Sequence, residues 1–230
     1  MLEIKGLSHR YADGTLSLDK VSFSLEKGQC LCVVGANGSG KSTLLELIAT
    51  ALKPDNGDIL LNGVSLLEDV KNSRKKIGLV FQEPDDQLFM PSVWEDVAFG
   101  VMSKSVTPEL GRSKAIEALS FVGAEHLADR VPHKLSGGEK CRVAIASILV
   151  TKPEVLLLDE PTASLDPRAR RNIINLLKTL DATKLIATHD LAMAFEVADR
   201  AIFLHEGRLA GESGIPGYFN DAAFLSSIGL

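Results

Sequence analysis

The stretch that decides the fold runs from residue 31 to residue 52 and reads LCVVGANGSGKSTLLELIATAL. It begins with a continuous apolar run, Leu31–Val34, which predicts a strand buried on both faces. Its second half predicts a helix from about Lys41 to Leu52. Between them, residues 35–42 match the pattern G-x-x-x-x-G-K-[ST] in full. A strand, a glycine-rich loop and a helix in this order predict a loop whose backbone N–H groups surround phosphate oxygens.

The residues of this loop have separate expected roles. The glycines let the backbone curl, and the positive end of the following helix attracts anions. We expect Lys41 to bridge the β- and γ-phosphates and the Ser42 hydroxyl to bind Mg²⁺. A plain glycine-rich turn would need no Lys-Ser pair at its end. The residues predicted here to bind ATP are Gly35, Ala36, Asn37, Gly38, Ser39, Gly40, Lys41, Ser42 and Thr43.

Two carboxylates end a second apolar run. Val155–Leu158 predicts a buried strand, and Asp159 and Glu160 follow it directly. Asp159, at the carboxyl end of a strand, is expected to hold Mg²⁺ through water. Glu160 is expected to polarise an attacking water as a general base. A simple strand end would account for one acid better than for two, so the two motifs together predict a nucleoside triphosphatase.

A third motif, LSGGE, occupies residues 135–139. Ser136 and Glu139 have the spacing of a capping box, so a helix is expected to begin here. The bare amides of Gly137 and Gly138 at that helix start could form a second anion site. Alone, the pattern is more typical of an ordinary helix cap, but its place shortly before the Asp-Glu strand favours a role at phosphate.

Composition excludes several other classes of protein. The chain has 230 residues, of which 45% are hydrophobic and 24% charged, as in ordinary globular proteins. Its formal net charge of -5 makes it a poor general binder of nucleic acids. No apolar run approaches the ~20 residues of a membrane span, and the N-terminus lacks a signal-peptide pattern. The cysteines at 30, 32 and 141 are sparse and odd in number, so we expect small buried thiols in a cytoplasmic protein.

The order of the predicted elements indicates an α/β fold. The last third of the chain alternates buried strands with helices, which is typical of a mainly parallel sheet. The N-terminal stretch reads as further strands, and a helical block from about Glu83 to Leu149 interrupts the sheet. We therefore expect two lobes with no flexible linker between them.

Together these motifs make the chain resemble the ATPase subunits of ABC transporters over nearly its whole length. Each motif occurs once and in the order of the family. Gly35–Ser42 resembles the Walker A loop, while Asp159 and Glu160 resemble Walker B and the catalytic glutamate. The other resemblances are those of Tyr11 to the aromatic residue that stacks on adenine, Gln82 to the Q-loop glutamine, Leu135–Glu139 to the signature motif, Ser164–Asp166 to the D-loop, and His189 to the switch histidine. Glu139 departs from the family, which usually has glutamine there.

The resemblance implies a P-loop NTPase core of the ABC ATPase type, with an inserted helical subdomain and an N-terminal antiparallel β region. One domain would cover residues 1–230, with its core in 1–82 and 151–230 and the helical subdomain in about 83–150. Glu160, His189 and Gln82 would be catalytic. The residues implied to bind Mg²⁺ are Ser42, Gln82 and Asp159.

The resemblance also implies a dimer, because two such subunits face each other head to tail in the family. Each ATP would then lie between the Walker A loop of one chain and the signature residues of the other, which here are Ser136, Gly137, Gly138 and Glu139. Both a homodimer and a heterodimer remain open. ATP and Mg²⁺ are the expected cofactors.

A narrower resemblance, to the energy-coupling-factor group, lies in Phe81–Phe89 and Pro91–Gly100. It implies a peripheral subunit on the cytoplasmic face of the membrane that powers an importer for a metal ion, such as cobalt or nickel, or for a vitamin. Its partners would be a transmembrane coupling protein and a substrate-binding membrane component, with no nucleic acid. Asp85 and Asp86 would pair with arginines of the coupling protein, although a solvated acidic loop is the alternative.

Two other functions stay open from the sequence. One is a soluble ABC-type ATPase not coupled to transport, although such chains usually carry coiled-coil insertions or two tandem cassettes. The other is a regulatory ABC subunit that binds ATP without hydrolysing it. The intact Glu160, His189 and signature motif argue against the second.

Overall fold

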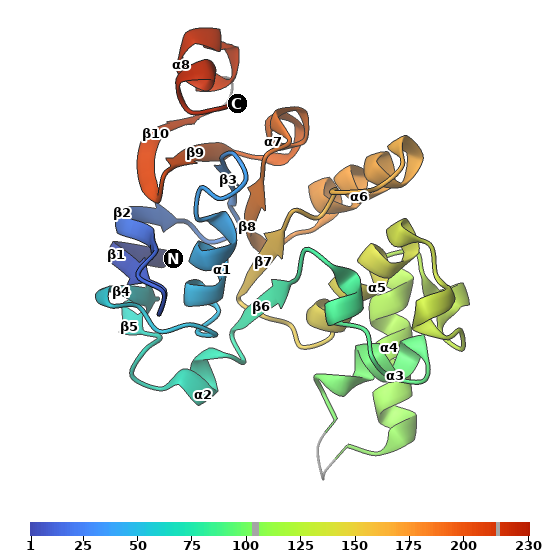
Figure 1. Cartoon of the computed structure of the whole chain (residues 1–230). Coiled ribbons are helices and arrows are strands. Elements are labelled where there is room, and N and C mark those ends of the chain that lie inside the picture. Colours follow the sequence, from blue (N-terminus) through green and yellow to red (C-terminus); the bar gives the residue numbers. More distant parts are fainter. Residues whose placement is uncertain (103–105, 215–216) are drawn as a thin grey trace. The chain divides into compact units, whose positions relative to one another are not determined.

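The computed structural model describes residues 1–102, 106–214 and 217–230, and these residues form two compact units. The first unit comprises Met1–Leu79, Glu154–Glu160 and Asp181–Leu230, and the second comprises Val80–Pro153 and Pro161–Leu180. Figure 1 labels their helices and strands. The expected single domain of 230 residues remains a prediction. Residues 161–180, which we assigned to the core, lie in the second unit with the helical block.

An antiparallel sheet begins the first unit, with the strand order β2-β1-β4-β5 in the described residues. Its strands are β1 (Leu2–Arg10), β2 (Leu16–Leu25), β4 (Asn56–Leu61) and the short β5 (Val64–Ser65). Leu2 pairs with Leu25 on one side and with Leu61 on the other. Buried residues alternate with more exposed ones along β1, because only one face of this sheet meets the core. This sheet is the N-terminal antiparallel β region that we expected.

A second sheet has the order β10-β9-β3-β8-β7-β6 and is mainly parallel. Its strands are β3 (Cys30–Val34), β6 (Ile77–Val80), β7 (Val155–Asp159), β8 (Thr183–Thr188), β9 (Arg200–His205) and β10 (Arg208–Gly214). Every residue of β3, β7 and β8 is buried, as the continuous apolar runs predicted. Cys30 and Cys32 are therefore buried thiols. The outer strand β10 is antiparallel to β9.

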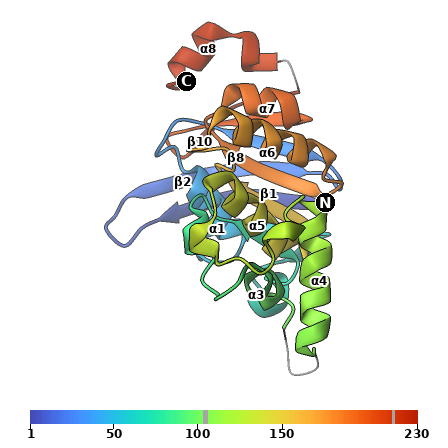
Figure 2. The same cartoon turned by 90° about the vertical axis from the view of Figure 1, so that its right-hand side faces the viewer.

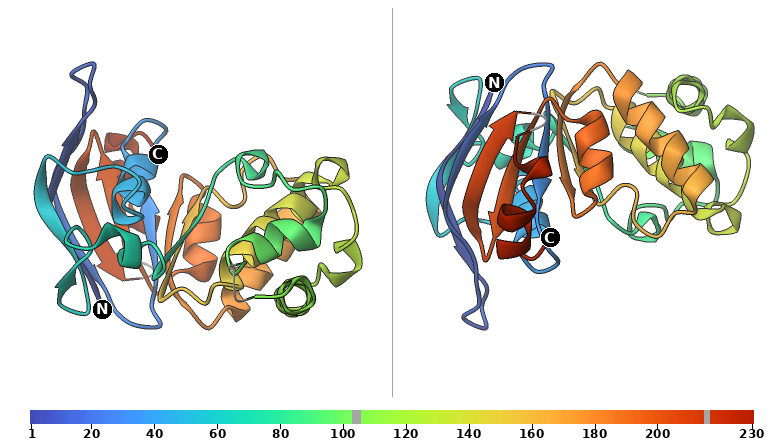
Figure 3. Two further views of the ribbon diagram at one scale, coloured as in Figure 1. Left: turned by 90° about the horizontal axis from the view of Figure 1, so that it is seen from below. Right: turned by 90° about the horizontal axis from the view of Figure 1, so that it is seen from above.

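One apolar core joins the two sheets of the first unit to helix α1 (Lys41–Ile48). Leu44, Leu45, Leu47 and Ile48 of α1 are fully buried in it. Figure 3 shows the blue β1–β2 strands beside the orange-red β9 and β10, and residues of β2 and β10 lie in contact. Arg208 at the start of β10 also donates to Asp19 of β2, with an Nη2 to Oδ2 distance of 2.7 Å. The sheets thus hold α1, and with it the glycine-rich loop, from two sides.

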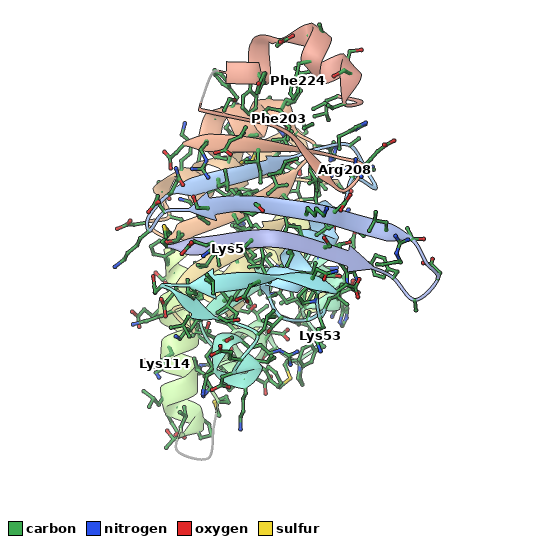
Figure 4. All side chains as sticks on the ribbon, turned by 90° about the vertical axis from the view of Figure 1, so that its left-hand side faces the viewer. Lys5, Lys53, Lys114, Phe203, Arg208 and Phe224 are labelled. Carbon is green, nitrogen blue, oxygen red and sulfur yellow. The ribbon has the colours of Figure 1, made fainter. Side chains whose placement is uncertain are left out.

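The remaining helices of the first unit are α2 (Val70–Ser73), α7 (Leu191–Val197) and α8 (Ala222–Ser227), the last preceded by the 3-10 turn η4 (Gly217–Asn220). Phe224 of α8 packs edge-on against Phe203 of β9, with ring centroids 5.3 Å apart (Figure 4). Among the described residues, no helix is long and apolar enough to span a membrane.

The second unit is helical, as predicted. It contains α3 (Val93–Phe99), α4 (Pro108–Phe121), α5 (Gly137–Leu149) and α6 (Pro167–Thr179), and α3, α4 and α5 pack together (Figure 2). Short 3-10 turns, η1 (Pro84–Asp86), η2 (Glu125–Leu127) and η3 (Pro132–Lys134), connect them. Thr107 and Asp166 cap α4 and α6, each followed by a proline at the first helical position.

Some predicted boundaries were wrong. Helix α1 ends at Ile48, not at Leu52, because the N–H groups of Ala51 and Leu52 bond to the carbonyl of Glu46 in a closing turn. Strand β6 ends at Val80 because the N–H of Phe81 donates to the Gln87 side chain. A local backbone turn decides the first of these ends, and the side chain of Gln87 decides the second.

We expect Leu157→Ala to lower the free energy of unfolding by about 2–5 kcal/mol, because truncation leaves a cavity at the centre of a close-packed sheet. Leu157 lies in β7 and is fully buried. The same substitution at Leu110, which is 47% exposed on α4, should change it by no more than about 0.5 kcal/mol. Urea denaturation of both variants measures the difference. Equal losses would contradict the assignment of Leu157 to the core.

Candidate nucleotide site

The glycine-rich loop connects β3 to α1, as the sequence predicted. Gly40 has a φ of 104°, and a Cβ there would lie 2.6 Å from the carbonyl oxygen of Ser17. A Cβ at Gly35 would lie 2.4 Å from the carbonyl oxygen of Leu204. Both positions therefore need glycine, and the close approach of β2 and β9 holds the loop in its shape.

Lys41 is buried beneath this loop, with 5% of its surface exposed. Its ammonium donates to the carbonyl oxygens of Gly35 and Ala36, at 2.9 Å and 3.0 Å. It also lies 3.5 Å from Oε1 of Glu160. The cation is thus held at the loop by carbonyl groups and by a single carboxylate, where an incoming phosphate could replace the weaker contacts.

Glu160 follows the end of β7 and is also buried. Its Oε2 accepts hydrogen bonds from the Thr188 hydroxyl at 3.2 Å and the His189 N–H at 3.3 Å. Nδ1 of His189 lies 2.9 Å from the same oxygen. In the described part of the chain, Oε1 has no hydrogen-bond partner. The carboxylate is therefore fixed through Oε2, while Oε1 is buried beside the Lys41 ammonium.

Asp159 is the second carboxylate of the site. Burial raises its pKa above the usual 3.8 and the charge of Glu160 adds to the rise, while the Ser42 hydroxyl bond and the charge of Lys41 oppose it. Its buried Oδ1 has no hydrogen-bond partner among the described residues. A hydroxyl and a carboxylate with a free oxygen are the hard ligands that Mg²⁺ prefers. Ser42 and Asp159 thus fit the ion that the sequence predicted.

The part of the chain that the structure describes contains no separate cluster of metal-ligating side chains. In those residues, no group of three or more histidine, cysteine, aspartate or glutamate side chains could hold a metal ion. A divalent cation bound at the loop would accordingly combine the Ser42 hydroxyl with Asp159, water and phosphate oxygens.

Tyr11 lies beside the first turn of α1. Its hydroxyl is 2.9 Å from Oγ1 of Thr43, and its ring is 39% exposed. The neighbouring His9 contacts the ring edge-on, with centroids 5.1 Å apart. A partly exposed aromatic ring next to a phosphate loop can stack on a base. The sequence pointed to Tyr11 but gave no signal for the hydroxyl contact with Thr43 or for Ser17, which donates to Thr43 at 2.8 Å.

The second unit carries the remaining predicted residues. Ser136 caps α5, and the Glu139 carboxylate accepts both the N–H and the hydroxyl of Ser136, at 2.8 Å and 2.7 Å. The capping box is confirmed. Ser92 and Glu95 have the same spacing in the sequence but form no capping box, because the Ser92 hydroxyl donates to Glu95 and makes no bond to a backbone N–H of α3.

A hollow of about 400 Å³ lies at the start of α5. Its lining includes Ser136 and Glu139 from α5, Arg142 one turn further on, and Asp166 and Arg168 from the start of α6. The bonds from the N–H and hydroxyl of Ser136 hold the pKa of Glu139 below its ordinary value, and the charges of Arg130 and Arg142 contribute to this. An ionised carboxylate and two guanidinium groups therefore share this opening.

The structure divides the predicted site residues between its units. The loop of residues 35–43, Tyr11, Asp159, Glu160 and His189 belong to the first unit. Gln82, the signature residues 136–139 and the segment Ser164–Asp166 belong to the second. Gln82 itself is exposed.

Comparison with known proteins agrees with these motifs. Residues 18–163 match the family described as ABC transporter. The whole chain is 43% identical to a putative ABC transporter ATP-binding protein of Geobacter sulfurreducens, covering 93% of that protein. It is 41% identical, again over its whole length, to the energy-coupling factor transporter ATP-binding protein EcfA of Methanocaldococcus jannaschii, covering 85% of that protein.

Two solved structures are similar over most of the chain. CbiO1 of Clostridium perfringens, described as part of the ABC transporter complex cbiONQ, superposes with a TM-score of 0.85 at 38% identity. That match covers 97% of this chain and 92% of CbiO1. The ATP-binding cassette MJ0796, solved as a dimer in a post-hydrolysis state bound to ADP and Pi, gives a TM-score of 0.84 at 30% identity. It covers 94% of this chain and 100% of MJ0796.

The Ser136–Glu139 cap predicts a pH dependence of stability. The folded pKa of Glu139 lies below its ordinary 4.5, so its bonds stabilise the folded state above that pH. This contribution is lost as the pH falls through the lower, folded pKa. As the pH falls from neutral through 4.5 and below, the unfolding free energy of the native protein should therefore fall relative to that of Glu139→Gln.

Urea denaturation across that range measures the difference. In a Ser136→Ala background, one of the two donors to Glu139 is gone, so the pH-dependent part should be smaller. A difference that stays constant with pH would show that the Glu139 bonds do not depend on its charge.

Proposed function

The chain belongs to the ABC transporter ATPase family, and from this we propose that it is the ATP-hydrolysing subunit of a membrane importer of the energy-coupling-factor type. The observation that carries the catalytic part is the buried Glu160 carboxylate, held through Oε2 and free at Oε1, next to the Lys41 ammonium. The importer type is supported by the similarity to EcfA and CbiO1. The cargo would be a metal ion such as cobalt or nickel, or a vitamin, enclosed by membrane components.

In this proposal the phosphates of ATP enter the loop of residues 35–43 and accept its backbone N–H groups. Lys41 then exchanges its bonds with the carbonyls of Gly35 and Ala36 for the β- and γ-phosphate oxygens. Tyr11 stacks on the adenine ring. Ser42 and Asp159, with Gln82 as a further ligand, would hold Mg²⁺, which supplies positive charge to the phosphate oxygens when bound.

Glu160 would act as the general base of the reaction. Thr188 and His189 hold its Oε2, so that Oε1 can accept a proton from a water lined up with the γ-phosphate. The amide of glutamine would keep this shape without the basicity. His189, whose side chain is 52% exposed, would contact the γ-phosphate while its Nδ1 stays beside Glu160.

A second ABC ATPase subunit would complete each site, in a homodimer or a heterodimer. The signature residues Ser136, Gly137, Gly138 and Glu139 would meet the nucleotide held by the partner's loop. Support comes from the hollow beside Ser136, which two arginines line, and from the dimeric form of the similar cassette MJ0796. Arg142 and Arg168 there would offset the negative charge of Glu139 as the phosphate approaches.

The segment Gln82–Gly100 is the proposed contact with the transmembrane coupling protein, which would hold the subunit at the cytoplasmic face of the membrane. Phe89 and Phe99 are 64% and 57% exposed and form an edge-to-face pair, with centroids 5.2 Å apart. The buried carboxylate of Asp96 fixes this turn by accepting the N–H groups of Phe89 and Met90, both at 2.9 Å. Such an exposed aromatic pair on a rigid turn suits an apolar helix of a partner.

Asp85 and Asp86 differ in their availability to that partner. Lys140 of α5 donates to both carboxylate oxygens of Asp85, at 2.6 Å and 2.8 Å. Asp86 is exposed at the end of η1. We therefore transfer the proposed arginine contact mainly to Asp86, while Asp85 links the loop to the signature helix within the chain.

The test of the catalytic proposal compares two variants. Glu160→Gln should bind ATP but hydrolyse it about 10²–10⁴ times more slowly, because the general base is lost. ATP should then hold it as a dimer in size-exclusion chromatography. Lys41→Ala should lose tight MgATP binding, measured by calorimetry, and should stay monomeric with ATP. Native turnover by Glu160→Gln would refute its role, and native affinity of Lys41→Ala would refute the phosphate site.

The test of docking is co-purification with the membrane partner. Asp86→Lys and Phe89→Ser should each abolish or strongly weaken assembly, since like charges or a lost apolar anchor at an interface cost several kcal/mol. Lys140→Met is the matched control, because it removes the Asp85 ion pair but leaves the exposed acid and the aromatic pair in place. Normal assembly of both loop variants would mean that the loop is only solvated.

A further inference from the structure

We infer that Thr43 is a positioning residue whose hydroxyl ties the Tyr11 ring to the first turn of α1, rather than binding phosphate. The inference rests on the proposed function, since it takes the loop as the phosphate site and Tyr11 as the contact of the base. It concerns Thr43, Tyr11 and Ser17, which we call the hydroxyl link.

The hydroxyl link occupies most of the bonding capacity of Thr43. A threonine hydroxyl has one proton to donate and two lone pairs. Ser17 Oγ donates into Thr43 Oγ1 at 2.8 Å, and the Tyr11 hydroxyl lies 2.9 Å from the same atom. Thr43 itself is buried, with 6% exposed. Its hydroxyl thus already has two protein partners, while its backbone N–H belongs to the first helical turn, whose N–H groups have no partner within the helix.

The backbone around the link is also fixed. The carbonyl oxygen of Ser17 would be 2.6 Å from a Cβ at Gly40, so β2 lies directly against the end of the phosphate loop. The N–H of Tyr11 donates to the Thr15 carbonyl and its own carbonyl accepts from Gly14, which closes the turn between β1 and β2. Tyr11 therefore belongs to a turn that backbone hydrogen bonds hold in place, and its hydroxyl group contacts α1 through Thr43.

His9 restrains the ring from a second direction. It is 8% exposed, and Nδ1 lies 3.1 Å from the Lys53 carbonyl oxygen. Its ring meets Tyr11 at an interplanar angle of 82°, an edge-to-face contact. With its ring against His9 and its hydroxyl on Thr43, the tyrosine is held in one orientation, while 39% of its surface stays exposed. Such preorganisation reduces the ordering entropy that binding of a base would otherwise lose.

The inference separates two kinds of ligand. Loss of the link would weaken the binding of a ligand that carries a base and would leave the binding of a ligand made only of phosphates unchanged. If the Thr43 hydroxyl bound phosphate, its removal would instead weaken the binding of both ligands. Inorganic tripolyphosphate with Mg²⁺ is therefore the probe to compare with MgATP.

Calorimetry on the full chain would measure both ligands for Thr43→Val, Tyr11→Phe and the double variant. We expect each single variant to bind ATP about 3- to 10-fold more weakly, the loss of one hydrogen bond. The double variant should be no weaker than the singles, because both remove the same link. Affinity for tripolyphosphate should be unchanged in all three, and Thr43→Ser should restore ATP binding. Tyr218→Phe and Thr179→Val, outside the site, are the matched controls.

Several outcomes would overturn the inference. If Thr43→Val lost the same factor of affinity for tripolyphosphate as for ATP, the hydroxyl would be a phosphate ligand. If the losses of ATP affinity added up in the double variant, the two hydroxyls would not act through one link. Native ATP affinity in both single variants would likewise mean that the link does not act on the ring. Failure of the native protein to bind either ligand would instead refute the proposed function, and native circular dichroism of the variants excludes misfolding as the cause.

Discussion

The site depends on a lysine and a glutamate that are both buried, with Lys41 Nζ and Glu160 Oε1 held 3.5 Å apart. Removing two charges from water costs several kcal/mol per ion, so each needs the other and further polar partners close by. The parallel pairing of β3 and β7 with β8 supplies this, because the carboxyl ends of all three strands then meet at one edge. Loop, helix α1 and the acids of β7 follow from that arrangement.

At this edge of the sheet, the polar groups of the site are already held in place before nucleotide binds. Lys41 is bonded to carbonyl oxygens of its own loop, and Glu160 is bonded through one oxygen only. Glu160 has a φ of 45°, an uncommon value for a side-chain-bearing residue, and the bond from its N–H to the Ala187 carbonyl holds it there. Polar groups in fixed positions of this kind need little reorganisation when phosphate and water arrive.

The helical unit also holds a group of polar side chains in fixed positions, at the start of α5. Glu139 stands where the family usually has glutamine, and its charge strengthens the cap on α5 through both donors of Ser136. That charge also lies in the opening where Arg142 and Arg168 gather. Lys140 of the same helix binds Asp85, so the start of α5 is joined to the loop that carries Gln82 and the exposed aromatic pair. A change at one of these places can therefore alter the others through a single helix.

The sequence by itself determined the α/β class, the buried strands β3 and β7 and the starts of α1 and α5, and it located the glycine-rich loop and the two acids at the end of β7. Glycine, proline and cap residues act over a few positions, so their effects can be read locally. Only the tertiary structure decided that Asp85 pairs with Lys140 and that Thr43 bonds to Tyr11 and Ser17. Those contacts join side chains or strands far apart in the chain, and their distances follow from packing, which no local pattern encodes.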